Sequence, residues 1–249
     1  MPAVTEGNVA DPVLLAWLRA QSAKGATVVS ICDGALVVAR AGLFDGHRAT
    51  GHWATLAQRR KDFAATRWLT DVRYVADGNV VSSAGVSAAI PTSLALVEAI
   101  GGSALAARTA ARLGANDWSD AHDSAPFHIG AETVFTYVGN RYLTTNERLA
   151  VPVADGVDDV ALALTLDAYG RTMRSPIAIR SAGAAVRTLH GLVLLPDAAS
   201  PPAREMPLAP GPSLSALDKA LADIGQRYGG ATERYVALEM EYGPAYQRH

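Results

Sequence analysis

The sequence has little of several features that define common protein classes. Its 249 residues include a single cysteine, which excludes an internal disulfide and any zinc site built from several cysteines. It has no uninterrupted apolar run of about 18 residues, the length that a membrane-spanning helix needs. The first twelve residues, MPAVTEGNVADP, contain neither the basic region nor the apolar core of a secretory signal. We therefore expect a cytoplasmic protein with no membrane partner.

An excess of charge of one sign is also missing. The chain has 22 Lys and Arg residues against 24 Asp and Glu residues, and its formal net charge is -2. The charges are scattered, so they do not form the continuous positive field that non-specific nucleic-acid binding needs. We expect no nucleic-acid partner.

Motifs for common cofactors and metals are absent too. Gly183 and Gly191 do not form the G-x-G-x-x-G loop that binds phosphate groups, so no nucleotide cofactor is indicated. His122 and His128 flank an acidic loop, but no third ligand stands at a metal-binding spacing. We predict that the protein uses neither a cofactor nor a metal.

Helical and extended segments alternate along the chain. Asp11 followed by Pro12 predicts the start of a helix, and the turn Asp77-Gly78 predicts a junction between two strands. The expected helices are 11–24, 35–41, 53–62, 84–100 (whose start Pro91 could delay), 158–171 and one from 214; the expected strands are 26–31, 67–75, 79–83, 149–153, 177–180 and 184–189. This alternation predicts an α/β layered fold with a mostly parallel sheet.

The lone cysteine stands where such a fold places reactive groups. Cys32 directly follows the buried strand 26–31 and precedes a helix, where outward-pointing backbone amides favour an anion and hence a thiolate. A buried structural cysteine is the alternative. His52 follows a glycine-containing turn further along, where a capping or surface role is the default, because linear spacing does not pair it with Cys32.

Two longer runs resemble a known family. SICDGALVVARAGLFDGHRATGHW and YVADGNVVSSAGVSAAIPTSLALVEAIGG are similar to stretches of the ThiJ/PfpI superfamily, especially of its isonitrile hydratase and AraC-type regulator branch. The resemblance covers about residues 11–112, with Pro91 where aspartate is usual. It implies a flavodoxin-like fold, that is, a three-layer αβα sandwich with a mostly parallel sheet. Members often dimerise, so the resemblance also implies a homodimer.

The resemblance assigns roles to individual residues. Cys32 corresponds to the nucleophile on the elbow between strand and helix, and His52 and Asp33 are its expected catalytic partners. The amides of Asp33 and Gly34 are expected to face a bound oxygen. The ligand of such a site is a small-molecule substrate, and the residues expected to bind it are Gly34, Thr50 and Gly85.

The chain also departs from the family pattern. The family's first strands are missing before Cys32, while a partial repeat begins near RLAVPVADGVDDVALALTLDAYGR. We therefore predict a core at 1–115 that lacks its first strands, a connector at 116–147 and a partial second repeat at 148–249. Either these are tandem truncated domains, or the second repeat completes the sheet of the first. We favour the composite, because an open sheet would expose unpaired edges.

The acidic residue of the family is missing as well. Its position in the repeat falls at Ala161, which cannot ionise. Asp158 and Asp159 stand nearby, and we interpret them as residues that cap the helix start and complement its dipole.

Other activities of this fold are disfavoured. A glutaminase has a glutamate two residues after its histidine, where this chain has Ala54, and the intracellular protease branch has histidine where this chain has Asp33. No helix-turn-helix pair follows Gly114. Three hypotheses remain: a cysteine-dependent hydratase or hydrolase of a small electrophile, a non-catalytic ligand- or protein-binding member, and a thiol-based oxidative sensor.

Overall fold

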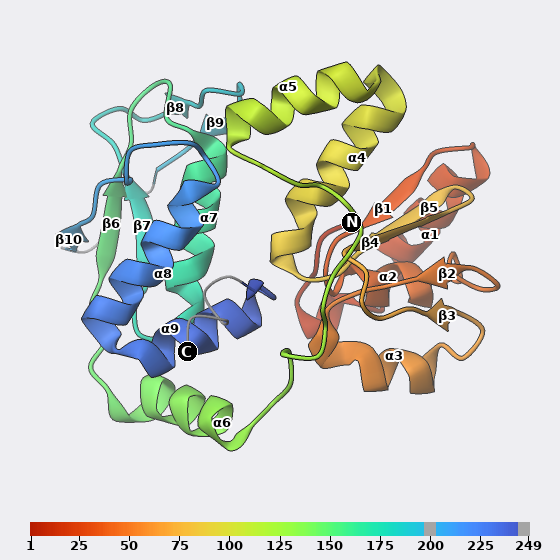
Figure 1. The fold of residues 1–249 in the computed structure, drawn as a ribbon, viewed down its shortest axis with the longest axis horizontal. Coiled ribbons are helices and arrows are strands. Elements are labelled where there is room, and N and C mark those ends of the chain that lie inside the picture. The colour runs from red at the N-terminus through yellow and green to blue at the C-terminus, as the bar shows by residue number, and fades with distance from the viewer. Residues whose placement is uncertain (197–202, 244–249) are drawn as a thin grey trace. The chain divides into compact units, whose positions relative to one another are not determined.

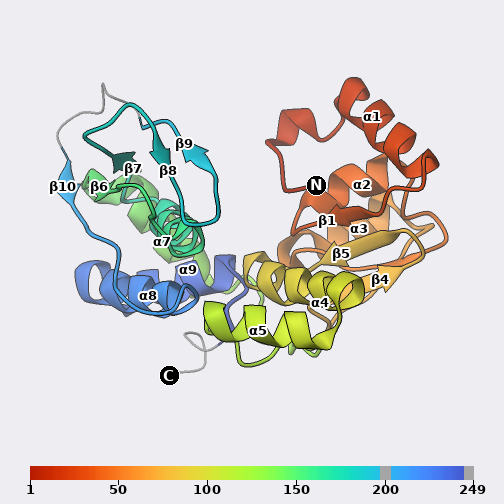
Figure 2. The same cartoon turned by 90° about the horizontal axis from the view of Figure 1, so that it is seen from above.

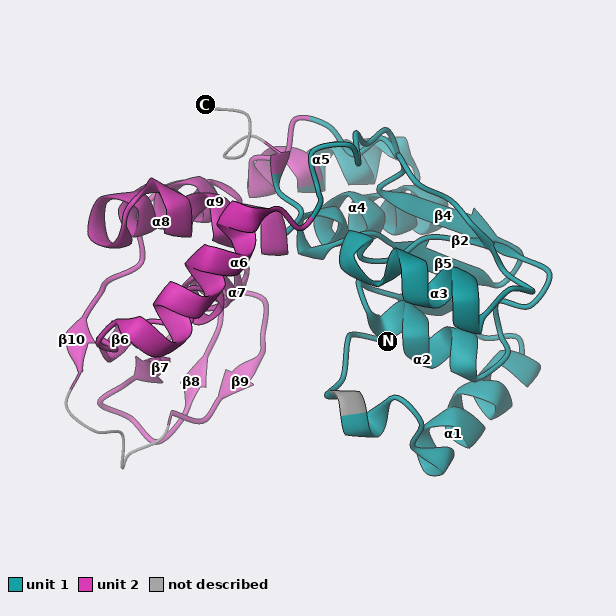
Figure 3. Ribbon diagram, turned by 90° about the horizontal axis from the view of Figure 1, so that it is seen from below, with its two compact units in different colours: residues 1–109, 117–128, 240–242 teal, residues 110–116, 129–239, 243–249 magenta. Residues whose placement is uncertain are grey.

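The computed structural model describes residues 1–196 and 203–243. The chain divides into two compact units (Figures 1 and 3). Unit 1 comprises residues 1–109, 117–128 and 240–242, and unit 2 comprises residues 110–116, 129–239 and 243–249. Each unit therefore contains segments that are far apart in the sequence. The predicted division at residues 115 and 147, and the composite arrangement of the two repeats, stay predictions.

Unit 1 follows the predicted alternation. Its elements are η1 (Glu6–Asn8), α1 (Pro12–Ala23), β1 (Val28–Ser30), α2 (Gly34–Arg40), β2 (Arg48–Ala49), η2 (Trp53–Thr55), α3 (Leu56–Asp62), β3 (Arg67–Trp68), β4 (Tyr74–Asp77), β5 (Val80–Ser83), η3 (Val86–Ala88), α4 (Ala89–Gly101) and most of α5 (Ser103–Leu113). The predicted start of α1 is confirmed, because the Asp11 carboxylate accepts hydrogen bonds from the amides of Val13 and Leu14.

The main sheet of unit 1 has the order β1-β5-β4. β1 and β5 are parallel, with Val28 opposite Val80, and β5 pairs with β4 in an antiparallel hairpin at the predicted turn. Figures 2 and 3 place this sheet between α1, α2 and α3 on one side and α4 on the other. The core forms because α2 is almost wholly apolar and buried, and it packs with residues of α1 and β1. β1 thus ends two residues before Cys32.

Unit 2 is built around a second parallel sheet, β10-β6-β7. Its elements are α6 (Ala131–Val138), the π-helical turn η4 (Gly139–Leu143), β6 (Leu149–Pro152), α7 (Asp159–Arg171), β7 (Ile177–Arg180), β8 (Val186–Arg187), β9 (Val193–Leu194), β10 (Arg204–Glu205), α8 (Ser215–Tyr228) and α9 (Gly230–Glu239). Asp158 caps α7 as predicted, since its carboxylate accepts from the amide of Ala161 at 2.9 Å.

The structure refines the sequence prediction in several details. Residues 67–75 do not form one strand: β3 and β4 are separated at Asp71, which has a φ of 59° and exchanges hydrogen bonds with Ser124. α4 begins at Ala89 rather than Ala84, as the presence of Pro91 suggested, and Pro91 lies in its first turn, where a missing amide is tolerated. Among the described residues the strands form four small sheets, in which four of the six strand pairs are parallel.

Within residues 1–196 and 203–243, no helix combines the length and the apolar character needed to cross a bilayer.

Candidate functional site

Cys32 lies between β1 and α2 in an unusual backbone conformation. Its φ is 56°, in the left-handed region that residues other than glycine seldom adopt. The residue is half-buried. Strain of this kind persists only where the surrounding structure holds it, and here β1 and the buried helix α2 fix the chain on both sides.

The structure brings together the three residues predicted to be catalytic. One ligand atom each from Cys32, Asp33 and His52 lies within 4.8 Å of the other two. His52 is buried, with 5% exposure, and its ring lies 5.3 Å from that of Trp53. Sequence spacing alone left open whether Cys32 and His52 meet, and the fold decides that they do.

A buried arginine next to this cluster was missed by the sequence analysis. Arg59 on α3 is 1% exposed and donates from Nη2 to the His52 carbonyl at 2.7 Å and from Nε to the Thr55 hydroxyl at 3.2 Å. The Thr55 hydroxyl in turn donates to Asp33 at 2.6 Å. The guanidinium also lies over the Trp68 ring, 4.7 Å from its centroid. In the sequence, Arg59 belongs to the run QRRKD, which is typical of a solvated helix face.

The charge of Arg59 interacts with the charges of the cluster. Burial lowers the pKa of Arg59 to about 10, and the charges of Asp33, Glu241 and Cys32 act in the opposite direction. The guanidinium is therefore still cationic at neutral pH. A cation at this place favours a thiolate at Cys32. The spacing of the Cys32, Asp33 and His52 atoms also suits metal ligands.

The predicted ligand-binding residues have distinct surroundings. The Gly34 amide donates to the Ile31 carbonyl at 2.9 Å, so the expected contact with a bound oxygen would have to replace this bond. Thr50 is buried and bonded at both ends, from its amide to the Ser82 hydroxyl and from its hydroxyl to the Leu69 carbonyl. These bonds anchor the chain two residues before His52.

Gly85 leads to a carboxylate that the sequence analysis also missed. Its amide donates to Glu241 Oε2 at 2.6 Å, and His122 Nε2 lies 3.0 Å from Glu241 Oε1. Glu241 is 3% exposed and has a φ of 54°. It follows α9 by two residues and lies more than 200 positions after Cys32, so no local signal in the sequence connects them. Ala161, the position predicted for an acid, lies in unit 2.

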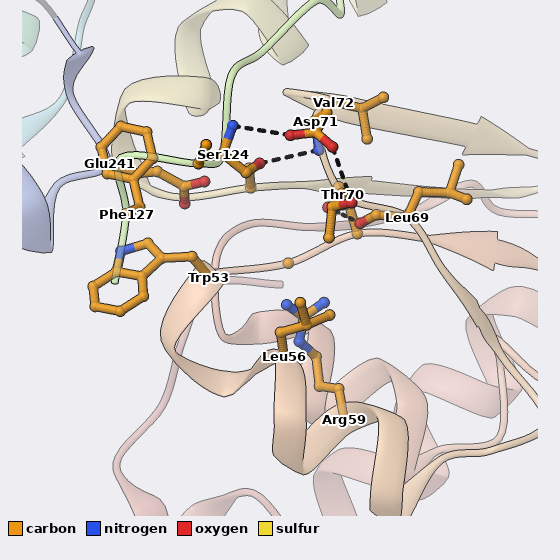
Figure 4. Close-up of a pocket in the computed structure, with 14 residues that line it drawn as sticks. Trp53, Leu56, Arg59, Leu69, Thr70, Asp71, Val72, Ser124, Phe127 and Glu241 are labelled. Carbon is orange, nitrogen blue, oxygen red and sulfur yellow. Dashed lines mark hydrogen bonds between the residues drawn. The ribbon is translucent and has the colours of Figure 1, made fainter. Parts of the chain in front are cut away.

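A pocket of about 330 Å³ adjoins these groups in unit 1 (Figure 4). Gly51 and Trp53, on either side of His52, line it together with Arg59 and Glu241. Its apolar walls are Trp53, Leu56, Leu69, Val72 and Phe127. This volume lies at the lower end of the range for small-molecule sites.

Comparison with known proteins identifies the amino-terminal region. Residues 3–99 match the sequence model of the DJ-1/PfpI family. They belong to that family. The ThiJ/PfpI resemblance inferred from the sequence motifs is thus confirmed. The flavodoxin-like α/β fold class is confirmed with it, because that is the fold of the family.

Named relatives of this DJ-1/PfpI domain include an enzyme and a regulator. Isonitrile hydratase from Pseudomonas putida is 37% identical over 94 residues, which are 37% of this chain and 39% of that protein. The HTH-type transcriptional regulator CdhR from Pseudomonas aeruginosa is 36% identical over 95 residues, which are 38% of this chain and 28% of the regulator. The chain therefore spans less than two-fifths of the length of either relative.

Solved structures with partial similarity include a regulator and a DJ-1 protein. An AraC family transcriptional regulator from Pseudomonas putida is 26% identical, with a TM-score of 0.37 over 39% of this chain and 52% of that one. Drosophila melanogaster DJ-1beta is 22% identical, with a TM-score of 0.40 over 45% of this chain and 59% of that one.

Proposed function

We propose that the protein is a cysteine-dependent hydratase or hydrolase of a small electrophile, with an isonitrile as the first substrate to test. The observation that carries the proposal is the cluster of Cys32, Asp33 and His52, whose ligand atoms lie within 4.8 Å of one another beside a buried cation. The isonitrile hydratase relative supports the choice of substrate.

The chemistry needs a nucleophile and a group that moves protons. The Cys32 sulfur would attack the terminal carbon of an isonitrile, which takes up one proton and becomes a thioimidate bound to the enzyme. Water then adds to the same carbon, the carbon–sulfur bond breaks, and an N-substituted formamide leaves while the thiol is restored. The net reaction adds one water molecule. Glu241 is the carboxyl group that we propose for proton transfer, in the role predicted for an acid at Ala161.

Alkylation of the thiol and turnover test this proposal together. Iodoacetamide should label Cys32 at pH 7 nearly as fast as at pH 9, because a cationic neighbour favours the thiolate. The Cys32→Ser variant is the blank, and His52→Ala tests the partner. Purified protein should convert benzyl isonitrile into N-benzylformamide, and Cys32→Ser should not. Slow labelling at pH 7 together with no formamide would refute the proposal.

A second candidate is ligand binding without turnover. It is favoured by the regulators among the relatives, of which CdhR is one. Slow labelling of Cys32 without turnover would favour ligand binding, whereas fast labelling without turnover would favour an oxidative sensor. Stable sulfinic acid on Cys32 under mild peroxide would indicate the sensor.

The oligomeric state, the cellular location and the absence of a nucleic-acid partner are also proposals. A homodimer, a cytoplasmic location and the lack of a nucleic-acid partner stay predictions. The names of the regulator relatives make a DNA-binding assay with the full chain worthwhile, and light scattering tests the dimer.

A further inference from the structure

Two polar groups in the unit 1 pocket have unused hydrogen-bonding capacity. The first is Arg59, whose Nη1 is buried and has no hydrogen-bond partner within the described part of the chain. This nitrogen lies against Gly51, where an added Cβ would approach it to 2.7 Å. Both residues line the pocket. A buried donor without a partner is unfavourable, so this N–H is suited to an acceptor that enters with a ligand.

The second group is the carboxylate of Glu241. It accepts one hydrogen bond from the Gly85 amide and forms one with His122. A carboxylate offers about four acceptor positions, so it retains capacity for a donor in the pocket. In Figure 4, Glu241 lies beside Phe127 and above Trp53, at the aromatic end of the pocket.

Four other polar residues of the lining, Thr50, Thr70, Asp71 and Ser124, already have hydrogen-bond partners. Asp71 and Ser124 exchange two hydrogen bonds of 3.0 Å, and the Thr70 hydroxyl donates to Asp71 at 3.1 Å. Thr50 is bonded at both ends, as described above. The pocket thus combines apolar walls with a buried donor, Arg59 Nη1, and a buried acceptor, the Glu241 carboxylate.

We propose that this pocket binds compact apolar molecules that carry a neutral secondary amide. The amide N–H would donate to Glu241, and the amide carbonyl would accept from Arg59 Nη1. A neutral group fits the local charge. A ligand carboxylate would be repelled by the negative charges of Asp33 and Glu241. A ligand ammonium group would be repelled by the Arg59 guanidinium. Hydration of an isonitrile yields such an amide, so the biological meaning of this inference rests on the proposed function. Binding of the amide itself needs no reaction at Cys32.

Calorimetric titration of the full-length Cys32→Ser variant tests the proposal without turnover. The probes are N-benzylformamide, N-benzyl-N-methylformamide, which lacks the N–H, and benzylamine, which is an ammonium ion at pH 7. We expect the secondary formamide to bind at least about tenfold more tightly than either other probe, because only it pairs with both groups. Equal affinities, tighter binding of the ammonium, or no binding of N-benzylformamide would overturn the assignment.

Substitutions locate the binding within the pocket. Glu241→Gln should weaken N-benzylformamide binding at least about tenfold, since it removes the charge that strengthens the hydrogen bond. Asp71→Asn is the matched control, because it neutralises another carboxylate of the same lining, and it should change the affinity less than twofold. Equal effects of the two variants would also overturn the assignment. Amide binding without isonitrile turnover would retain this site and refute the enzymatic proposal.

Discussion

At the scale of single residues, the site depends on close approaches that leave no room for a methyl group. A Cβ at Gly85 would lie 2.5 Å from the Glu241 Cβ and 3.2 Å from the His52 Cδ2. Neither neighbour can move freely, because both side chains are buried. Gly85 has a φ of -66°, so the backbone conformation itself does not require glycine. Glycine is favoured at this position because its neighbours leave no room for a side chain.

We therefore expect Gly85→Ala to destabilise unit 1 by about 1–3 kcal/mol through overpacking. Urea unfolding followed by tryptophan fluorescence measures this directly, since all four tryptophans belong to unit 1. Gly7→Ala is the control, because nothing lies within 4 Å of its added Cβ, and its midpoint should hardly move. Unchanged stability of Gly85→Ala would mean that Glu241 does not occupy this place.

At the scale of elements, the β8–β9 hairpin is fastened to the start of α7 by Asp159. The Thr188 hydroxyl donates to Asp159 at 2.6 Å, and His190 is bonded to the other carboxylate oxygen. Burial acts to raise the pKa of Asp159, but the hydrogen bonds from His190 and Thr188 outweigh it and hold the pKa below its usual value. Asp158 and Asp159 were both predicted to cap the helix; the cap is Asp158, and the side chain of Asp159 bonds to the hairpin instead.

Asp159→Asn should loosen the hairpin by about 1–2 kcal/mol at pH 7. Because the pKa of Asp159 is lowered on folding, its contribution is fully present above the unfolded pKa of about 3.9 and is lost as the pH falls through the lower folded value. Hydrogen exchange of the hairpin amides, corrected for the intrinsic rate, measures the difference. It should be large at pH 7 and small near pH 2.

The control for this prediction lies on the same helix. Asp167→Asn removes an exposed ion pair with Arg171, so hairpin protection should change by less than about 0.5 kcal/mol. The assigned role of the carboxylate would be contradicted if Asp159→Asn lowered hairpin protection by the same amount at pH 7 and near pH 2.

At the scale of the whole molecule, a short segment after α9 completes unit 1. Residues 240–242 belong to unit 1, although the helix before them belongs to unit 2. The Ser87 amide donates to the Met240 carbonyl at 3.1 Å, and the Ser87 hydroxyl donates to the Glu241 carbonyl at 2.6 Å. With the Gly85 and His122 contacts of the Glu241 carboxylate, four hydrogen bonds hold this segment.

A chain that ends at Glu239 should therefore have a less stable unit 1 than a chain that ends at Gly243. The expected loss is at least about 2 kcal/mol, since each of the four hydrogen bonds contributes about 0.5–1.5 kcal/mol. Tryptophan-monitored urea unfolding compares the two chains, which differ only in residues 240–243. Equal midpoints would show that the segment does not stabilise unit 1.

The sequence by itself determined much of the local structure and the family of residues 3–99. Asp11 and Asp158 were identified as helix caps because capping depends on neighbouring amides, and the Asp77-Gly78 turn was predicted because turn chemistry is local. The motifs around Cys32 and His52 were sufficient to predict the DJ-1/PfpI family.

Only the tertiary structure decided which distant groups meet. Arg59 looked like part of a solvated charge run, and its burial became visible only when α3 packed beside the site. Glu241 is separated from Cys32 by most of the chain, and its hydrogen bonds with Gly85, Ser87 and His122 place it in unit 1. Periodicity and capping report on contacts within a few residues, whereas burial and charge pairing depend on contacts across the whole fold.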